Sequence, residues 1–226
     1  MMRRTLLSLS LLSGLMATPA LAQTVADVGK PPVTTVFNYA VETDQAKEPE
    51  NVLLLDLSNG GRVAIRLMPT WAPQHVERIK TLAAQGFYNG VVFHRVIDGF
   101  MAQTGDPTGT GTGGSPLPDL ASEFNSIPHL RGTVSMARTN DPNSANSQFF
   151  IVFYPRFSLD KKYTVFGRVI AGMEHVDAIE RGEPPQNPTK VVQASLASEN
   201  KPRPAAPVQT VEQAITPDML SSSKSN

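Results

Sequence analysis

The chain has 226 residues, a formal net charge of zero, 40% apolar and 18% charged residues, and no cysteine. This composition is typical of a globular protein with a buried core, and it excludes a wholly disordered chain. The balance of charge argues against a nucleic-acid-binding protein, which usually carries an excess of basic residues. The absence of cysteine excludes disulfides, thiolate metal sites and cysteine nucleophiles.

The first 22 residues have the pattern of a secretory signal peptide. Arg3 and Arg4 form a basic start, an apolar run extends from Leu6 to Met16, and Ala20-Leu21-Ala22 places small residues around a cleavage site. The apolar run is shorter than the roughly 20 residues that span a bilayer, so we expect cleavage and no lasting membrane insertion. The mature chain is then expected to begin at Gln23 and to reside in a bacterial periplasm.

Composition divides the remaining chain into three parts. Residues 23–48 hold Pro31-Pro32, lie next to Pro49 and show no sustained hydrophobic period, which predicts an extended leader. Residues 49–197 are predicted to form one domain. From 198 to 226, proline, alanine, serine and charged residues dominate, so little apolar area offsets the entropy of ordering and we expect a disordered tail.

The domain begins with a predicted hairpin and a helix. The apolar run Val52–Leu57 indicates a strand, and Asn59-Gly60 predicts a two-residue turn in which both residues adopt positive φ. Alternating apolar residues from 63 to 67 indicate the return strand. Pro73 is suited to the first turn of a helix that bears an apolar stripe, and Gly86 is placed to end it.

Six further short strands and one more helix follow. The strands are predicted at Val91–His94, Phe100–Gln103, Thr133–Ala137, Gln148–Phe153, Thr164–Ile170 and Lys190–Leu196, and the helix at Met173–Glu180. Many short strands with only two helices indicate a mainly β fold, a closed antiparallel barrel capped by helices.

Three segments carry the functional signal. They are FHRVIDGFMAQTGD at 93–106, SMAR at 135–138 continuing to NSQFFI at 146–151, and FSLD at 157–160 continuing to YTVFGRV at 163–169. The glycine-rich GTGTGG at 109–114 lies between the first two. In order and spacing, these segments resemble those of the cyclophilins, the peptidyl-prolyl cis-trans isomerases. The resemblance covers about residues 51–196, and it implies an eight-stranded barrel with a helix over each end and a substrate groove on its outer face.

The same resemblance implies a role for each of ten residues. Arg95 is the catalytic hydrogen-bond donor. The apolar proline pocket and its neighbourhood consist of Phe100, Met101, Phe150, Leu159 and Tyr163; Gln103 and Gln148 bind the substrate backbone; Ala137 and Arg138 contact the residue before proline. Because adjacent strand residues point to opposite faces, Phe149 is left for the core when Phe150 faces the groove.

The implied chemistry needs no nucleophile, metal or cofactor. The barrier to rotation about an X-Pro bond, roughly 18–20 kcal/mol, comes from amide resonance, and a fixed donor and an apolar pocket suffice to lower it. We expect the protein to act as a monomer on proline-containing unfolded or folding polypeptides, with no nucleic-acid partner. The alternative is a binding module or holdase chaperone that captures proline segments with little turnover; the presence of Arg95 favours the enzyme.

Two positions depart from the commonest cyclophilin pattern. Ser158 stands where many members carry a tryptophan, and Tyr163 stands where they carry a histidine. Tyrosine keeps a ring with a polar tip, so we expect the proline site to be retained. Serine lacks both the indole face and its N–H donor, so we expect weak binding of cyclosporin.

Other kinds of site find no support in the sequence. The run GTGTGG lacks the Gly-Lys-Ser/Thr ending of a phosphate-binding loop. The four histidines show no pair at i, i+4 spacing, which argues against a zinc site. Ser135 and Ser147 lack a Gly-x-Ser-x-Gly elbow, and no Ser-His-Asp triad is predicted.

Overall fold

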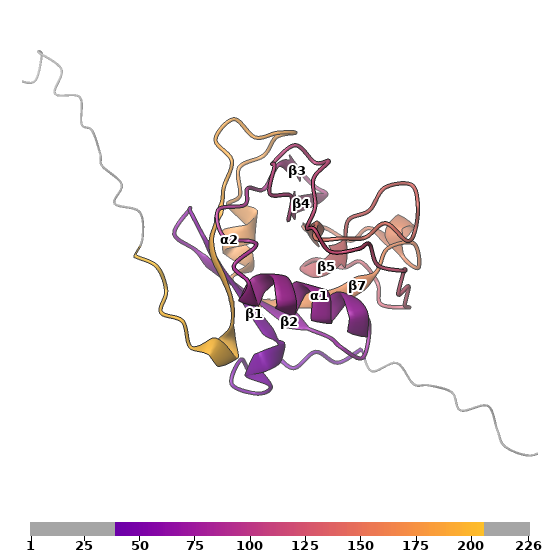
Figure 1. Cartoon of the computed structure of the whole chain (residues 1–226), viewed down its shortest axis with the longest axis horizontal. Helices are drawn as coiled ribbons and strands as arrows, with labels where there is room; N and C mark the ends of the chain where they lie inside the picture. Colours follow the sequence, from indigo (N-terminus) through magenta and orange to yellow (C-terminus); the bar gives the residue numbers. More distant parts are fainter. Residues whose placement is uncertain (1–38, 206–226) are drawn as a thin grey trace, which may run out of the picture. The chain divides into compact units, whose positions relative to one another are not determined.

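The computed structural model describes residues 39–205 of the chain. The signal peptide predicted at 1–22, most of the predicted leader and residues 206–226 lie outside this part. Eight antiparallel strands form one sheet in the order β3-β4-β6-β5-β7-β2-β1-β8 (Figure 1). The strands are β1 (Val52–Leu57), β2 (Arg62–Leu67), β3 (Arg95–Ile97), β4 (Met101–Thr104), β5 (Thr133–Met136), β6 (Phe149–Val152), β7 (Val165–Ala171) and β8 (Val191–Leu196).

Two α-helices and three 3₁₀ turns accompany the sheet in the described residues. The helices are α1 (Pro73–Ala84) and α2 (Met173–Asp177); the turns are η1 (Pro49–Asn51), η2 (Phe157–Leu159) and η3 (Ala197–Glu199). Helix α1 contacts β7 and β8, and α2 contacts β2. The mainly β fold with eight antiparallel strands and two helices confirms the class that the sequence predicted.

The sheet is strongly curled, but it is less closed than the predicted barrel. Strands β3 and β8 are its two edges, and no ladder joins them in the described residues. The segments just before these strands meet instead through an isolated bridge between Val92 and Lys190 and through a 2.9 Å bond from the Phe93 N–H to the Thr189 carbonyl. The architecture is therefore a curled half-barrel whose edges are linked by a few backbone hydrogen bonds.

The main core lies between the inner face of the sheet and α1. Leu53 and Leu55 of β1 pack there with Ile79 and Leu82 of the helix and with Phe149 of β6. The first turn of α1 has no capping side chain of its own. The carboxylate of Glu123, from a distant loop, accepts the N–H groups of Gln74 and His75 instead, at 3.2 and 3.1 Å. This long-range cap satisfies donors that the helix itself leaves unpaired.

Three local predictions need correction. In the β1–β2 hairpin, only Gly60 has positive φ, because the turn spans Leu57–Gly60 and is closed by the bond from the Gly60 N–H to the Leu57 carbonyl. The strand predicted at Val91–His94 forms only the isolated bridge of Val92, and the ladder to β4 begins at Arg95. Helix α2 ends at Asp177 rather than at residue 180, and the chain then turns back toward β3.

Both flanks of the domain contact it within the described residues. Arg66 of β2 is almost fully buried, and its guanidinium donates to four backbone carbonyls of residues 42–48, at 2.6–3.1 Å. The side chain of Gln193 in β8 donates to the Pro202 carbonyl at 3.1 Å, and Arg203, beyond that strand, donates to the Gly60 carbonyl. Residues 42–48 and 202–203, which lie outside the predicted domain, thus form hydrogen bonds with it.

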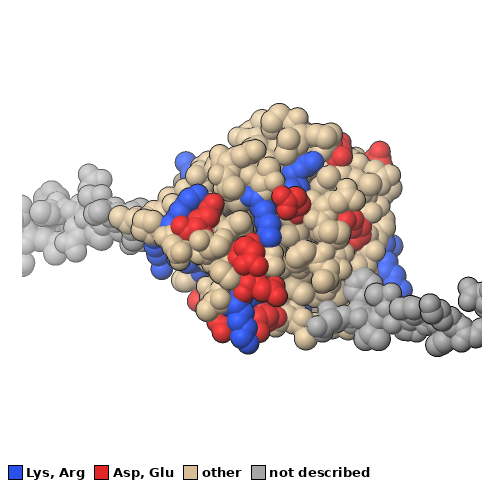
Figure 2. Space-filling view, turned by 60° about the horizontal axis from the view of Figure 1, so that its bottom comes forward, with Lys and Arg blue, Asp and Glu red and all other residues tan. Residues whose placement is uncertain are grey.

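The surface carries both signs of charge. Figure 2 shows a face on which lysine and arginine side chains lie beside aspartate and glutamate side chains. Among residues 39–205 there is no helix with the length and apolar character that crossing a membrane requires.

Candidate active site

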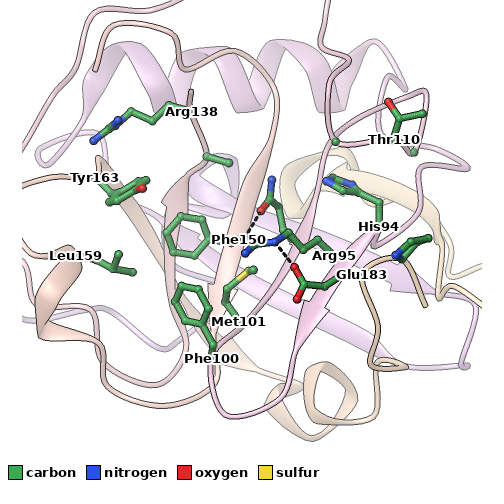
Figure 3. A pocket seen from close by; sticks show the side chains of 15 residues that line it. His94, Arg95, Phe100, Met101, Thr110, Arg138, Phe150, Leu159, Tyr163 and Glu183 are labelled. Atoms are coloured by element: carbon green, nitrogen blue, oxygen red, sulfur yellow. Dashed lines mark hydrogen bonds and ion pairs between the residues drawn. The ribbon is translucent and has the colours of Figure 1, made fainter. Parts of the chain in front are cut away.

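A cavity of about 730 Å³ lies where β3, β4 and β6 meet the loops that follow β5 and β6 (Figure 3). Nine of the ten residues predicted for the site line it: Arg95, Phe100, Met101, Gln103, Ala137, Arg138, Phe150, Leu159 and Tyr163. The tenth, Gln148, lines an adjoining cavity of about 520 Å³ that shares Gln103, Gly111, Ala137 and Arg138 with the first. The fold therefore gathers side chains from segments as far apart as residues 95 and 163.

One half of the cavity is apolar because strand alternation separates it from the core. Phe149 belongs to the main core, whereas Phe150 packs with Met101 in a separate cluster on the other face of β6. Phe100 also reaches this cluster because it lies in the turn before β4, outside the strand alternation. Leu159 from η2 and Tyr163 from the following loop complete the apolar wall.

A buried histidine supports the ring of Phe150 from behind. The His129 ring stacks on it with 6.2 Å between centroids and 17° between planes. His129 Nδ1 lies 2.8 Å from Asp160 Oδ1, and His129 Nε2 lies 3.2 Å from Ser135 Oγ. The structure thus brings together a serine, a histidine and an aspartate that the sequence did not predict to meet. Ser135 is fully buried and its hydroxyl donates to the Thr164 carbonyl, so it is not an accessible nucleophile. The hydrogen bonds between these side chains instead hold the ring that supports Phe150.

The other half of the cavity is polar and centred on Arg95. Its Nε donates to Glu183 Oε2 at 2.7 Å, and its Nη1 lies 3.4 Å from Gln103 Oε1. Gln103 Nε2 in turn donates to Gln148 Oε1 at 2.9 Å. Arg95 is thereby connected to both glutamines that the resemblance assigns to the substrate backbone.

The glycine-rich loop closes this polar side. Gln148 Nε2 donates to the carbonyls of Gly111 and Gly113. The buried carboxylate of Asp106 accepts N–H groups from Thr108, Thr110, Gly111 and Gly113. Burial alone raises the pKa of Asp106, but hydrogen bonds from the Thr108 hydroxyl and from these backbone N–H groups outweigh it and bring the pKa to about 2. The loop is therefore organised around an ionised carboxylate.

A cation lies at the far end of the apolar wall. The guanidinium carbon of Arg138 is 4.5 Å from the centroid of the Tyr163 ring, and its N–H groups donate to the Lys162 carbonyl. Tyr163 also meets Phe150 edge to face, with 5.8 Å between centroids. Tyr163, which stands where the resemblance places a histidine, thus contacts both Phe150 of the apolar wall and Arg138.

Sequence reasoning missed several residues of the cavity wall: His94, Gly109, Thr110, Gly111, Glu183 and Pro184. His94 is adjacent to Arg95, so its neighbourhood in the sequence is a usable signal. Glu183 carries no local signal, because it is 88 residues from Arg95 and reaches the site only through the fold.

Comparison with known proteins assigns the chain to a family. The family model for cyclophilin-type peptidyl-prolyl cis-trans isomerases matches residues 53–198. The chain belongs to this family. The matched segment spans the sheet from the second residue of β1 onward and both helices, and it contains all ten predicted site residues. As a cyclophilin-type enzyme, the protein catalyses peptidyl-prolyl cis-trans isomerisation.

Individual relatives agree with this assignment. The chain is 48% identical over 178 residues to a probable peptidyl-prolyl cis-trans isomerase of Brucella suis, which covers 72% of this chain and 90% of the relative. It is 32% identical to a crystallised cyclophilin of Hirschia baltica, with a TM-score of 0.63, over 69% of this chain and 77% of that one. A cyclophilin-type isomerase of Cryptosporidium parvum, solved in the presence of the dipeptide Ala-Pro, is 28% identical with a TM-score of 0.60, over 64% of this chain and 98% of that one.

Proposed function

We propose that this cyclophilin accelerates X-Pro isomerisation by combining the Arg95 donor with the apolar pocket of Phe100, Met101, Phe150 and Leu159. The observation that carries the proposal is their meeting in one cavity, with the guanidinium on the polar side and the apolar cluster opposite. A guanidinium is always charged and presents several N–H groups in a fixed fork. Among the described residues, no partner bonds its Nη2, which leaves donors for a substrate.

The chemistry follows from the electronic change during rotation. As the X-Pro bond twists, amide resonance is lost and the prolyl nitrogen regains its lone pair. A donor that faces this nitrogen binds the twisted state more strongly than the planar one, and only such differential binding accelerates the step. The apolar wall holds the proline ring while the preceding carbonyl swings. The Cryptosporidium relative, solved with a proline dipeptide present, supports a proline-containing substrate for this chain as well.

Replacement of Arg95 tests the donor role. We expect Arg95→Ala to lower kcat/KM for a proline tetrapeptide by at least about tenfold, or roughly 1.4 kcal/mol of transition-state stabilisation. Arg95→Lys keeps the charge without the fork and should recover only part of the rate. Rates are measured by a cis/trans-coupled peptide assay, with the melting temperature of each variant as the folding control. A folded Arg95→Ala protein that isomerises at the parent rate contradicts the proposal, whereas retained peptide binding without turnover in the parent points to the holdase.

We further propose that the clients are exported polypeptides in the periplasm. The support is the amino-terminal pattern alone: Arg3 and Arg4, the apolar run and Ala20-Leu21-Ala22. Expression of the full chain in a bacterium, followed by osmotic shock and mass measurement, should yield a periplasmic protein that begins at Gln23. Recovery of an uncleaved chain in the cytoplasm contradicts this proposal and leaves the enzymatic one unaffected.

A further inference from the structure

Glu183 is a carboxylate in the active-site wall, and it contacts the side chain to which we assign the chemistry. We propose that Glu183 is a positioning residue that fixes the guanidinium of Arg95 for isomerisation. The proposal rests on the donor role of Arg95, and it adds a residue that lies outside the three segments that carry the family resemblance. It is based on the 2.7 Å contact between Arg95 Nε and Glu183 Oε2 and on the way the fold anchors Glu183.

The segment that carries Glu183 is tied directly to the strand that carries Arg95. Gly182 exchanges two backbone hydrogen bonds with Val96, the residue after Arg95, at 2.8 and 2.9 Å. Gly182 has φ +147°, and a Cβ there would lie 2.5 Å from the Cα of Pro185, so a glycine is needed at this position. Because Gly182 precedes Glu183 and Val96 follows Arg95, these two backbone bonds bring Glu183 next to Arg95.

Arg181, the residue before Gly182, anchors the segment that carries Glu183 to the end of α2. Arg181 donates to the carbonyls of Asp177 and Ile179, at 2.7 and 2.6 Å. Its guanidinium also lies over the ring of Phe153, 4.2 Å from the centroid. The backbone at 179–182 is thus held by the end of α2 and by β3 together, and the Glu183 carboxylate is presented from a fixed base.

Within the described residues, two nitrogens of the Arg95 guanidinium bind protein side chains, and the third is left for the substrate. Glu183 takes Nε and Gln103 takes Nη1, so two acceptors from different strands and loops define the plane of the guanidinium. Figure 3 shows Arg95 between Glu183 on one side and Phe150 and Met101 of the apolar wall on the other. Fixing a catalytic group before substrate arrives removes part of the entropy cost from the reactive step. Loss of the Glu183 contact should therefore lower kcat more than it raises KM.

The magnitude is limited because both side chains are partly exposed, 42% for Arg95 and 51% for Glu183. Ion pairs of this kind are worth at most about 1 kcal/mol, which corresponds to about fivefold in rate. We accordingly expect Glu183→Ala to lower kcat/KM about three- to fivefold, mainly through kcat. Glu183→Gln keeps an acceptor oxygen for the Nε–H and should restore part of the loss.

The decisive experiment is a double-mutant cycle on the mature protein, with the parent, Arg95→Ala, Glu183→Ala and the double variant. If Glu183 acts through Arg95, its replacement changes kcat/KM less than about 1.5-fold in the Arg95→Ala background. Glu174→Ala is the matched control: it removes one exposed carboxylate that lies 3.6 Å from His175 and is not part of the cavity wall. This control should keep the parent rate.

Three results overturn the proposal. A higher rate for Glu183→Ala means that the carboxylate competes with substrate for the guanidinium. An unchanged rate means that Gln103 alone fixes Arg95, and an equal loss with and without Arg95 means that Glu183 supports the loop rather than the arginine. An Arg95→Ala variant as active as the parent instead refutes the proposed donor role, so the two failures are distinguishable.

Discussion

Ser158 lies beside the proline pocket that the family resemblance implies, and we expect it to limit how tightly a large inhibitor binds there. It lies in η2 immediately before Leu159, and its neighbour Phe157 is 64% exposed and does not line the cavity. The family resemblance places a tryptophan here that packs against cyclosporin and donates a hydrogen bond to it. Losing one such contact costs about 1–3 kcal/mol, or roughly one to two powers of ten in affinity. We expect weak inhibition of the parent, and tighter inhibition of Ser158→Trp with little change in peptide turnover.

Titration of both proteins with cyclosporin in the isomerase assay checks this expectation. Phe157→Ala is a suitable control, since removal of an exposed ring outside the cavity should leave inhibition of the parent unchanged. Nanomolar inhibition of the parent that disappears in Phe157→Ala contradicts the prediction and shows that the phenylalanine takes the place of the indole.

At the scale of elements, Arg66 connects β2 to the segment that precedes the domain. Its four bonds to backbone carbonyls are made by a fork that lysine lacks, and its site is almost fully buried. We expect Arg66→Lys to lower the free energy of unfolding by about 2–4 kcal/mol and to speed tryptic cleavage after Lys47. Arg168, which pairs with Arg66 across the β2–β7 ladder and is partly exposed, is the matched control. Equal urea-unfolding curves for the parent and Arg66→Lys count against this role.

The elements that periodicity predicted well are those whose hydrogen bonds and burial are regular. The alternation at 63–67 and the apolar stripe of α1 correspond closely to β2 and to the helix. The strand predicted at Val91–His94 from the apolar pattern of 91–93 is wrong. The ladder to β4 begins only at Arg95, and its start depends on the position of the partner strand rather than on the local apolar pattern. Helix α2 is shorter than predicted because the chain beyond Asp177 is held by the bonds of Arg181 and Gly182.

In the candidate site, too, residues with a local sequence pattern were predicted, and residues that depend on distant contacts were missed. Residues inside the three motif segments, such as Arg95 and Phe150, were predicted, and the fold brings them together. The support of Phe150 by His129 and of Arg95 by Glu183 depends on contacts across 21 and 88 residues, which no local pattern encodes. Their assigned roles remain predictions for the assays above.

For the molecule as a whole, we expect three buried histidines to make stability depend on pH. Burial is the main cause that lowers the pKa of His75, His94 and His129, although nearby carboxylates oppose it. An unfolded histidine takes up a proton near pH 6.5, so below that pH the unfolded chain binds more protons than the folded one. Stability should therefore be complete above about pH 7 and should decrease as the pH falls below 6.5.

Urea unfolding at pH 7.5, 6.5 and 5.5, at constant ionic strength, measures this dependence. His129→Gln should reduce the slope, because it removes one of the buried rings whose pKa is lowered. A free energy of unfolding that stays constant over the range would show that the buried rings are protonated without cost.

The position of β1 in the sheet has a consequence for how the protein is made. β1 (Val52–Leu57) is flanked by β2 on one side and by β8 (Val191–Leu196) on the other. During synthesis from the amino terminus, one edge of the earliest strand stays unpaired until the latest one has been translated. Unpaired edges invite intermolecular association, and contacts of such long sequence separation form slowly. A nascent chain interrupted before residue 196 is therefore unable to complete its sheet, however much of its core it already contains.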